Sequence, residues 1–242
     1  MNSADQKALP AMGPAASLLI FFSASLLLLF TTHYLIPMLS RLTNMETILW
    51  WFIAGGLGTF LPLVILAFYL LKREGAFKQR DWWSVRLRFR KMNKGDWMWS
   101  VSALIIIGIL SFAVSKLLEI YAGKFDHQPP FMSFEPLTPG RYWILAAWLP
   151  FWLLNIMGEE IIWRGVMLPR QELVFGRFTW LFHGTGWALF HIAFGWQLLF
   201  TLLPILYIQS YVVQKRSNSW TGVVIHAGLN GPGFLAVSFG LV

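Results

Sequence analysis

The apolar residues of the chain gather in long stretches, each close to the roughly 17–25 residues that a helix needs to cross the hydrocarbon core of a membrane. Of its 242 residues, 57% are hydrophobic and only 12% are charged, against about 25% in an average soluble domain. The sequence therefore predicts an all-α membrane protein, a bundle of about seven transmembrane helices. We place these helices at roughly 15–37, 47–71, 97–117, 142–164, 178–195, 197–213 and 219–241.

Two further features of the composition agree with this class. The 14 tryptophans and 21 phenylalanines suit aromatic belts and lipid-facing walls. The chain contains no cysteine, which excludes disulfides and thiolate metal sites. The first apolar run, from Ala15 to Ile36, is longer than a signal-peptide core of about 7–15 residues, and we expect it to remain as a span.

Positive charge is concentrated in one connection, residues 72–96, which we call the basic loop. Cytoplasmic loops of membrane proteins carry an excess of Lys and Arg, so the basic loop is expected in the cytoplasm. The N-terminus is then cytoplasmic and the C-terminus lies outside. The compact length favours a bacterial inner membrane, with the endoplasmic reticulum as the alternative. Only four cations fall outside in this orientation: Arg41, Lys116, Lys124 and Arg141.

The basic loop also indicates a partner. Its cations alternate with apolar residues from Val85 to Arg90, directly after Trp82 and Trp83. Such a pattern could contact nucleic acid, but its position between two spans favours anionic lipid headgroups, with the indoles as interfacial anchors. We therefore expect the loop to contact the anionic bilayer surface and no nucleic acid.

The first chemically distinctive motif is Glu-Glu-x-x-x-Arg, at Glu159, Glu160 and Arg164. A charge near the bilayer centre costs about 2.5–3.5 kcal/mol on insertion scales, so such groups persist only where they pair, face water or do chemistry. Residues four apart share a helix face, so Glu160 should pair with Arg164. Glu159 points about 100° away and is left to accept a proton from water. Alternatively, both glutamates end a helix at the cytoplasmic face.

Two more polar motifs lie in later spans. Trp187 and His191 are one helical turn apart, so the indole can shield the imidazole from water. His226 and Asn230 also share a face; the amide can donate to an oxyanion, and the imidazole can donate, accept or bind a metal. Taken singly, each motif could be a packing contact. We expect His183, two turns before His191, to lie at the membrane interface.

Together, the three motifs resemble those of the CPBP family, in the same order and each in its own span. This family comprises the CAAX prenyl endoproteases and bacterial processing and bacteriocin-immunity proteins, also called Abi proteins. The resemblance covers about residues 142–240 and includes the turn from Lys215 to Trp220. One departure is Trp187, where the family usually has Phe.

The resemblance implies an intramembrane protease, with roles carried to the matching positions. Glu159 would be the general base for water, assisted by His191. The His226 motif would stabilise the tetrahedral oxyanion, and the Glu-Arg pair of the first motif would hold the geometry. The chain then divides into N-terminal transmembrane helices with the basic cytoplasmic loop, residues 1–141, and a catalytic core, residues 142–242.

The family is often described as metal-dependent, which raises the question of a cofactor. Glu159, His191 and His226 could hold Zn²⁺ with an open water position, their side chains coming from three helices. The chain lacks the His-Glu-x-x-His helix that marks a strong zinc site. Carboxylate and imidazole can also activate water directly. We favour this metal-free form and take Zn²⁺ as the alternative.

Convergence of the three motifs places a condition on the fifth span. Glu159 and His226 lie about 8–10 Å from the cytoplasmic ends of their predicted helices, whereas His191 lies about 20 Å beyond Phe178 on a straight helix. We therefore expect residues 172–182 to run along the membrane surface and the fifth span to begin late.

Three functions are compatible with the sequence. The first is an intramembrane endopeptidase for a membrane-anchored or lipidated protein or peptide, with a cavity open to the cytoplasm or laterally to lipid. The second is a non-catalytic membrane-binding or immunity protein of the same fold. The third is a proton-coupled transporter, which the lack of internal repeats argues against.

Overall fold

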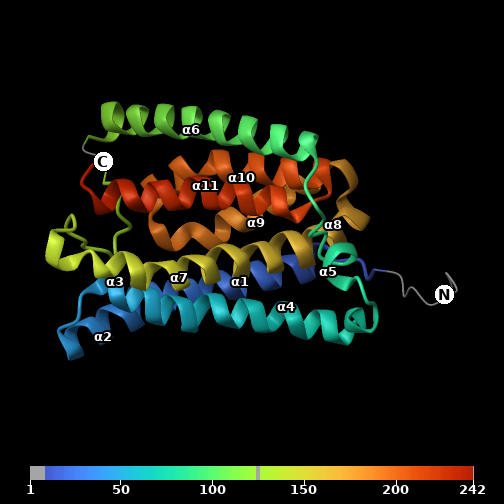
Figure 1. Cartoon of the computed structure of the whole chain (residues 1–242), viewed down its shortest axis with the longest axis horizontal. Helices are drawn as coiled ribbons and strands as arrows, with labels where there is room; N and C mark the ends of the chain where they lie inside the picture. The colour runs from blue at the N-terminus through green and yellow to red at the C-terminus, as the bar shows by residue number, and fades with distance from the viewer. Residues whose placement is uncertain (1–8, 124–125, 242) are drawn as a thin grey trace, which may run out of the picture.

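The computed structural model describes residues 9–123 and 126–241. Within these residues seven long helical runs lie along one axis, and no strand occurs (Figure 1). Five segments are long and apolar enough to cross a membrane, so the chain is an integral membrane protein of the predicted all-α class. The runs are α1 (Pro14–Phe30), Thr31–Leu35 and α2 (Ile36–Thr43); α3 (Thr47–Trp50), Trp51–Phe60 and α4 (Leu61–Arg73); α6 (Lys94–Ala122); α7 (Trp143–Glu159), Glu160–Met167 and α8 (Leu168–Phe175); α9 (Thr179–Phe190) and His191–Phe194; α10 (Trp196–Arg216); and α11 (Ser219–Ser238).

One helical run is much longer than its predicted span. The span expected at 142–164 continues through a π-helical stretch into α8 and ends at Phe175. The prediction ended it at Arg164 because a charge in lipid is costly. In the structure Arg164 is buried and pairs within its own helix, and Arg170 pairs with a glutamate at the end of α4. Neither charge meets lipid, so neither ends the helix.

Glycines make the two sharp turns around α9. Gly176 has a φ of +53° and Gly195 a φ of +84°, a left-handed region that glycine enters without steric cost. These turns separate α9 from α8 and α10. The α-helix between them has only 12 residues, which places His191 directly at its C-terminal end.

The connections alternate between the two ends of the bundle. The basic loop lies at the same end as the α8–α9 connection and the α10–α11 turn (Figure 1). The α2–α3 turn, the α6–α7 connection and the end of α11 lie at the opposite end. Seven helices that each cross the membrane once would place their connections at alternating ends in this way. The predicted orientation assumes this number of crossings. The assignment of each end to a side of the membrane stays a prediction.

The basic loop is folded onto the protein. It contains the short helix α5 (Trp82–Val85), and its alternating stretch turns Leu87 and Phe89 into the core. Arg88 forms a bidentate ion pair with Glu172 of α8, with N–O distances of 2.9 and 2.7 Å. Leu87 and Phe89 therefore face the core and the cations of the alternating stretch face outward. One of these cations, Arg88, is paired with an acidic residue of the protein itself. Contact of the remaining cations with anionic lipid stays a prediction.

A capping box fixes the point where the basic loop enters α6. The Asn93 side chain accepts from the Asp96 backbone N–H, and the Asp96 side chain accepts from the Asn93 N–H, each at 3.0 Å. Arg216, at the end of α10, donates from Nε to Asp96 Oδ1 at 2.8 Å. These bonds tie the start of α6 to the end of α10.

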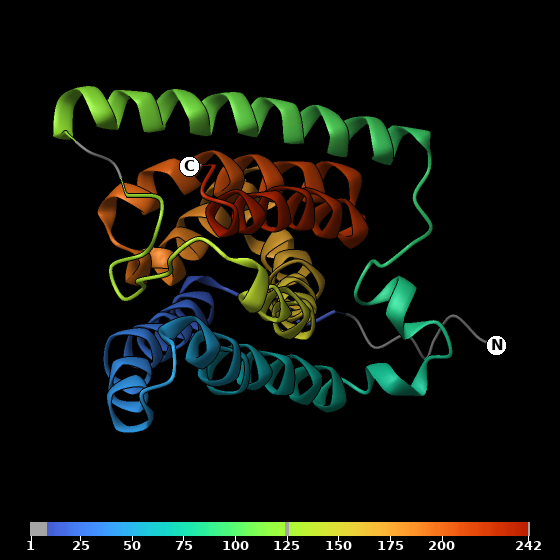
Figure 2. The same ribbon diagram turned by 60° about the vertical axis from the view of Figure 1, so that its left-hand side comes forward.

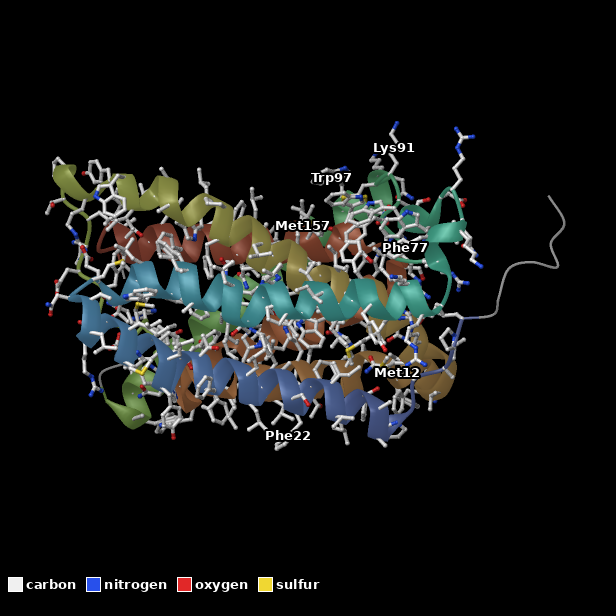
Figure 3. All side chains as sticks on the ribbon, turned by 90° about the horizontal axis from the view of Figure 1, so that it is seen from below. Met12, Phe22, Phe77, Lys91, Trp97 and Met157 are labelled. Carbon is white, nitrogen blue, oxygen red and sulfur yellow. The ribbon has the colours of Figure 1, made fainter. Side chains whose placement is uncertain are left out.

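The core helices α7–α11 lie between two flanks (Figure 2). α6 forms one flank and packs on α10 and α11, and α1–α4 form the other. The flanks expose large apolar side chains such as Phe22, which points away from the bundle in Figure 3 and is 52% exposed. On its inner face α1 contacts the core through Phe21, whose ring stacks on Trp163 with centroids 4.8 Å apart. An apolar outside around a packed core suits a bundle in lipid.

Candidate active site

Glu159 lies mid-way along the α7–α8 run, where the α-helix passes into the π-helical stretch Glu160–Met167. Such stretches frequently occur at functional sites. The buried carboxylate accepts three hydrogen bonds: Asn155 Nδ2 donates to Oε1 at 2.9 Å, and the indoles of Trp163 and Trp187 donate to Oε2 at 3.2 and 2.7 Å. Oε1 accepts only one of these bonds, so it keeps a lone pair for another donor.

Glu160, the next residue, is fully buried and has different partners. Gln209 Nε2 donates to its Oε1 at 2.7 Å, and His226 Nδ1 lies 3.0 Å from the same oxygen. Arg164 Nε lies 3.7 Å from Oε2, which is the ion pair that the four-residue spacing predicted. The guanidinium also stacks on the Trp187 ring, with Cζ 3.4 Å from the ring centroid. Glu160 thus joins three helices at the base of the site.

The two imidazoles present the same nitrogen to the site. His191 Nδ1 lies 2.9 Å from the backbone oxygen of Trp187, and because a carbonyl oxygen only accepts, Nδ1 carries the proton. His226 Nδ1 faces the Glu160 carboxylate, which likewise accepts. In each neutral ring the free lone pair is therefore on Nε2.

A cavity of about 950 Å³ brings the three motifs together. Its wall includes Glu159, His191, His226 and Asn230. In the part of the chain that the structure describes, Asn230 makes no hydrogen bond with the other three, and its amide is free to meet a ligand. Most of the remaining wall is apolar and includes the aromatic residues Trp51, Phe52, Phe60, Trp148, Phe151 and Phe194.

The first half of the chain supplies part of this wall, a role that the sequence did not reveal. Trp51 packs on Phe151 of α7 with ring centroids 5.3 Å apart, and Phe52 packs on the same ring at 5.2 Å. Ile107 and Ser111 of α6 line the cavity from the other flank. Helices from both halves of the chain therefore enclose the three motifs.

Trp187 is the central residue of the site. Its indole donates to Glu159, its face supports Arg164, and its ring centroid lies 5.3 Å from that of His191 and 5.6 Å from that of His226. The predicted shielding of His191 is present. The hydrogen bond to Glu159 was missed, because helix spacing says nothing of where an indole N–H points.

The three motifs meet with an unbroken α9, and the expected course of residues 172–182 along the membrane surface stays a prediction. Residues 172–182 end α8, turn at Gly176–Phe178 and begin α9, which is unbroken along its length. The motifs reach one level because the helix before α9 is longer than predicted. The stretch from Glu159 to the end of α8 at Phe175 includes the π-helical residues Glu160–Met167, and His191 directly follows α9, which begins at Thr179.

His183 is buried rather than interfacial. Its side chain is 0% exposed, its Nδ1 lies 2.6 Å from Gln171 Oε1, and its ring packs edge-on against Phe21. The prediction assumed that α9 starts at a free surface, whereas α8 and α1 both pack against it. His183 does not line the cavity.

The sequence of the core matches a known family. Residues 141–231 match the family model described as type II CAAX prenyl endopeptidase Rce1-like. Over this segment the chain is similar to that family, and we call the segment the Rce1-like domain. The match confirms the resemblance to the CPBP family and places the domain in a family of proteases. No curated protein and no solved structure matches the chain. The Rce1-like domain includes every candidate site residue: Glu159, Glu160, Arg164, His191, His226 and Asn230.

The Rce1-like domain does not fit a zinc ion in this geometry. Oε2 of Glu159 already accepts two hydrogen bonds from indole N–H groups, and Oε1 accepts one from the Asn155 amide. Within residues 9–123 and 126–241, no three side chains of His, Asp or Glu lie close enough together to hold a metal. His191 and His226, two of the three candidate ligands, lie against the Trp187 ring, and Glu159, the third, accepts a hydrogen bond from its indole.

Close helix packing behind Glu160 gives a first testable prediction. A Cβ added at Gly222 would overlap Glu160 Oε2 and lie 3.0 Å from Val213 Cγ2. We expect Gly222→Ala to displace the carboxylate, lower activity and destabilise the Rce1-like domain by about 1–3 kcal/mol, the usual effect of overpacking. The measurement is the thermal unfolding midpoint in detergent. Gly108→Ala on α6, where a Cβ meets nothing within 4 Å, is the matched control and should unfold like the wild type.

Proposed function

We propose that the protein is an intramembrane endopeptidase that hydrolyses a peptide bond of a membrane-anchored or lipidated protein or peptide. The observation that carries the proposal is the cavity wall, where an acid with a free lone pair and two imidazoles with free Nε2 atoms surround one space. The protease family of the domain supports it. The largely apolar remainder of the wall suits an apolar segment drawn from the membrane.

Glu159 acts as the general base in this proposal. A water at Oε1 gives its proton to the carboxylate while its oxygen attacks the carbonyl carbon of the substrate. His191 assists by accepting a hydrogen bond from the same water at Nε2. The proton on Glu159 then passes to the amide nitrogen, the C–N bond breaks, and an amine and a carboxylic acid leave the site.

The oxyanion formed in the attack needs donors that are already in place. Asn230 offers its side-chain amide to the cavity. Once protonated at Nε2, His226 would be the second donor, with its Nδ1–H held by Glu160. Glu160 and Arg164 break no bond; they hold the His226 and Trp187 rings in position.

Trp187 positions the general base, and this role predicts a specific kinetic defect. We expect Trp187→Phe to lower kcat by about 10- to 100-fold and to change KM little, because a hydrogen bond to a charged group contributes about 1.5–3 kcal/mol. Phe keeps an aromatic ring in the wall and removes the donor to Glu159, although it also offers a smaller face to Arg164. Trp196→Phe, at the exposed start of α10, is the matched control. An unchanged kcat in Trp187→Phe would refute the positioning role.

The proposed function is tested by comparing membrane peptides from cells that carry the wild-type protein or His191→Ala. The variant loses the nitrogen that holds the attacking water, so we expect uncut precursors to accumulate and their fragments to disappear. Identical peptide sets would argue for a binding protein without catalysis. The identified precursor then serves as the substrate for purified protein, where cleavage should persist in a strong chelator; a loss that zinc restores would overturn the metal-free mechanism.

A further inference from the structure

Outside the cavity, α9 contacts the α7–α8 run through two layers of polar side chains. Trp187 and His183 are one turn apart on α9, and each meets a residue of the facing run. Arg164 stacks on Trp187, with Cζ 3.4 Å from the ring centroid, and Gln171 Oε1 lies 2.6 Å from His183 Nδ1. The charge of Arg164 also acts on the His183 ring, so the two layers lie close to each other.

Several polar atoms of these two layers have no protein partner. Arg164, Gln171 and His183 are fully buried. Among the residues that the structure describes, none forms a hydrogen bond with Arg164 Nη1 or Nη2, with Gln171 Nε2 or with His183 Nε2. Native proteins satisfy nearly all buried polar groups, and where no protein atom does so, an internal water usually does.

The four unpartnered atoms need a partner that both accepts and donates. Gln171 Oε1 only accepts, so His183 Nδ1 carries the proton and, in the neutral ring, Nε2 keeps a lone pair. The Arg164 guanidinium and the Gln171 NH₂ group only donate. A water can accept from these groups and donate to Nε2, whereas an anion has no proton to donate. Two hydrogen bonds of about 2.8 Å each let one water span roughly one helical turn.

We propose that a buried water joins His183 Nε2 to the Arg164 guanidinium, and that His183 is thereby a positioning residue for Glu159. The water holds the guanidinium on the Trp187 face, and the Trp187 indole in turn donates to Glu159 Oε2 at 2.7 Å. His183 lies outside the cavity and touches no substrate. The effect on catalysis rests on the proposed function, whereas the water and the hold on Trp187 do not.

A crystal structure of the wild-type protein that resolves ordered waters tests the water directly. We expect one water within about 3.2 Å of both His183 Nε2 and a nitrogen of Arg164. A dry space between the two side chains, a direct bond from Arg164 to His183, or an anion between them would overturn the proposal.

The hold on Trp187 is measured by the ¹⁵N–¹H resonance of its indole, which Trp187→Phe identifies by its loss. His183→Phe keeps a ring against Phe21 and removes Nε2. We expect the Trp187 indole proton to move upfield, as its bond to Glu159 weakens. The same variant should lower kcat by about 3- to 10-fold, the effect of one weakened hydrogen bond, and change KM little. His183→Gln returns an acceptor near the Nε2 position and should recover most of both losses.

Thr179→Val is the matched control for a purely structural effect. Thr179 is buried at the start of α9, and its hydroxyl donates to the backbone oxygen of Gly176 at 2.7 Å, so the variant loses a hydrogen bond of the same helix. It should lower the unfolding midpoint and leave the Trp187 resonance and kcat unchanged.

An unchanged Trp187 resonance in folded His183→Phe would overturn the proposal. If this variant does not fold, Gln171→Met takes its place, because the variant no longer fixes the proton on His183 Nδ1 and should shift the resonance in the same direction. The resonance and the crystal structure do not depend on cleavage. If both are as expected but the wild-type protein cleaves nothing, the proposed function alone fails.

Discussion

Glu159→Gln should abolish peptide cleavage while leaving the protein folded. A general base contributes about 10²- to 10⁴-fold to the rate, so we expect a loss within that range. The amide of Gln has nearly the shape of the carboxylate, and its oxygen can still accept from the Trp163 and Trp187 indoles. Asn155 can turn its own amide to accept from the new NH₂ group. The measurement is the initial rate of cleavage by reconstituted protein, together with its unfolding midpoint.

The matched control for this variant is Glu46→Gln. Glu46 lies outside the cavity and pairs with Arg141 at the surface, with a side chain that is 45% exposed. The same chemical change there should alter neither the rate nor the unfolding midpoint. If Glu159→Gln cleaves the precursor at the wild-type rate, Glu159 is not the base.

Glu160→Gln, unlike Glu159→Gln, should mainly lower the stability of the folded protein. The buried Arg164 charge is balanced by Glu160 and by the Trp187 ring, and removing one partner of a buried ion pair costs about 3–5 kcal/mol. Gln209 and His226 would also lose the carboxylate that accepts from them. We expect a large drop in the unfolding midpoint and little folded protein. Of the two adjacent glutamates, Glu159 would then have a catalytic role and Glu160 a structural one.

The origin of that effect can be tested with a second variant. Arg164→Met combined with Glu160→Gln removes both charges and replaces the arginine with an apolar side chain, an exchange that is often neutral or stabilising. The double variant should therefore recover much of the stability lost in Glu160→Gln. If the double variant is as unstable as the sum of two single losses, the ion pair is not what Glu160 contributes.

The sequence was sufficient for the features that depend on regular helix geometry. The apolar stretches predicted the helical runs, and the four-residue spacings predicted the Glu160–Arg164 pair and the contact between Trp187 and His191. Each of these follows from 3.6 residues per turn and needs no knowledge of neighbouring helices.

The features that were missed depend on contacts between helices. The α7–α8 run is longer than predicted because Arg170 forms an ion pair with Glu74, which directly follows α4 and lies 96 positions earlier in the chain. His183 is buried because Gln171 and Phe21 cover it. The bond from Trp187 to Glu159 and the aromatic wall from the first half of the chain both require the packed bundle. Nothing local in the sequence marks them.

The most direct test of the account is the mass of the products that purified wild-type protein forms from the identified precursor in H₂¹⁸O. Direct attack by a water held at Glu159 predicts two fragments, one of which carries a single ¹⁸O in its new terminal carboxyl group. Glu159→Gln should form neither fragment. Intact precursor after prolonged incubation with folded wild-type protein, or labelled fragments formed equally fast by Glu159→Gln, would contradict the account.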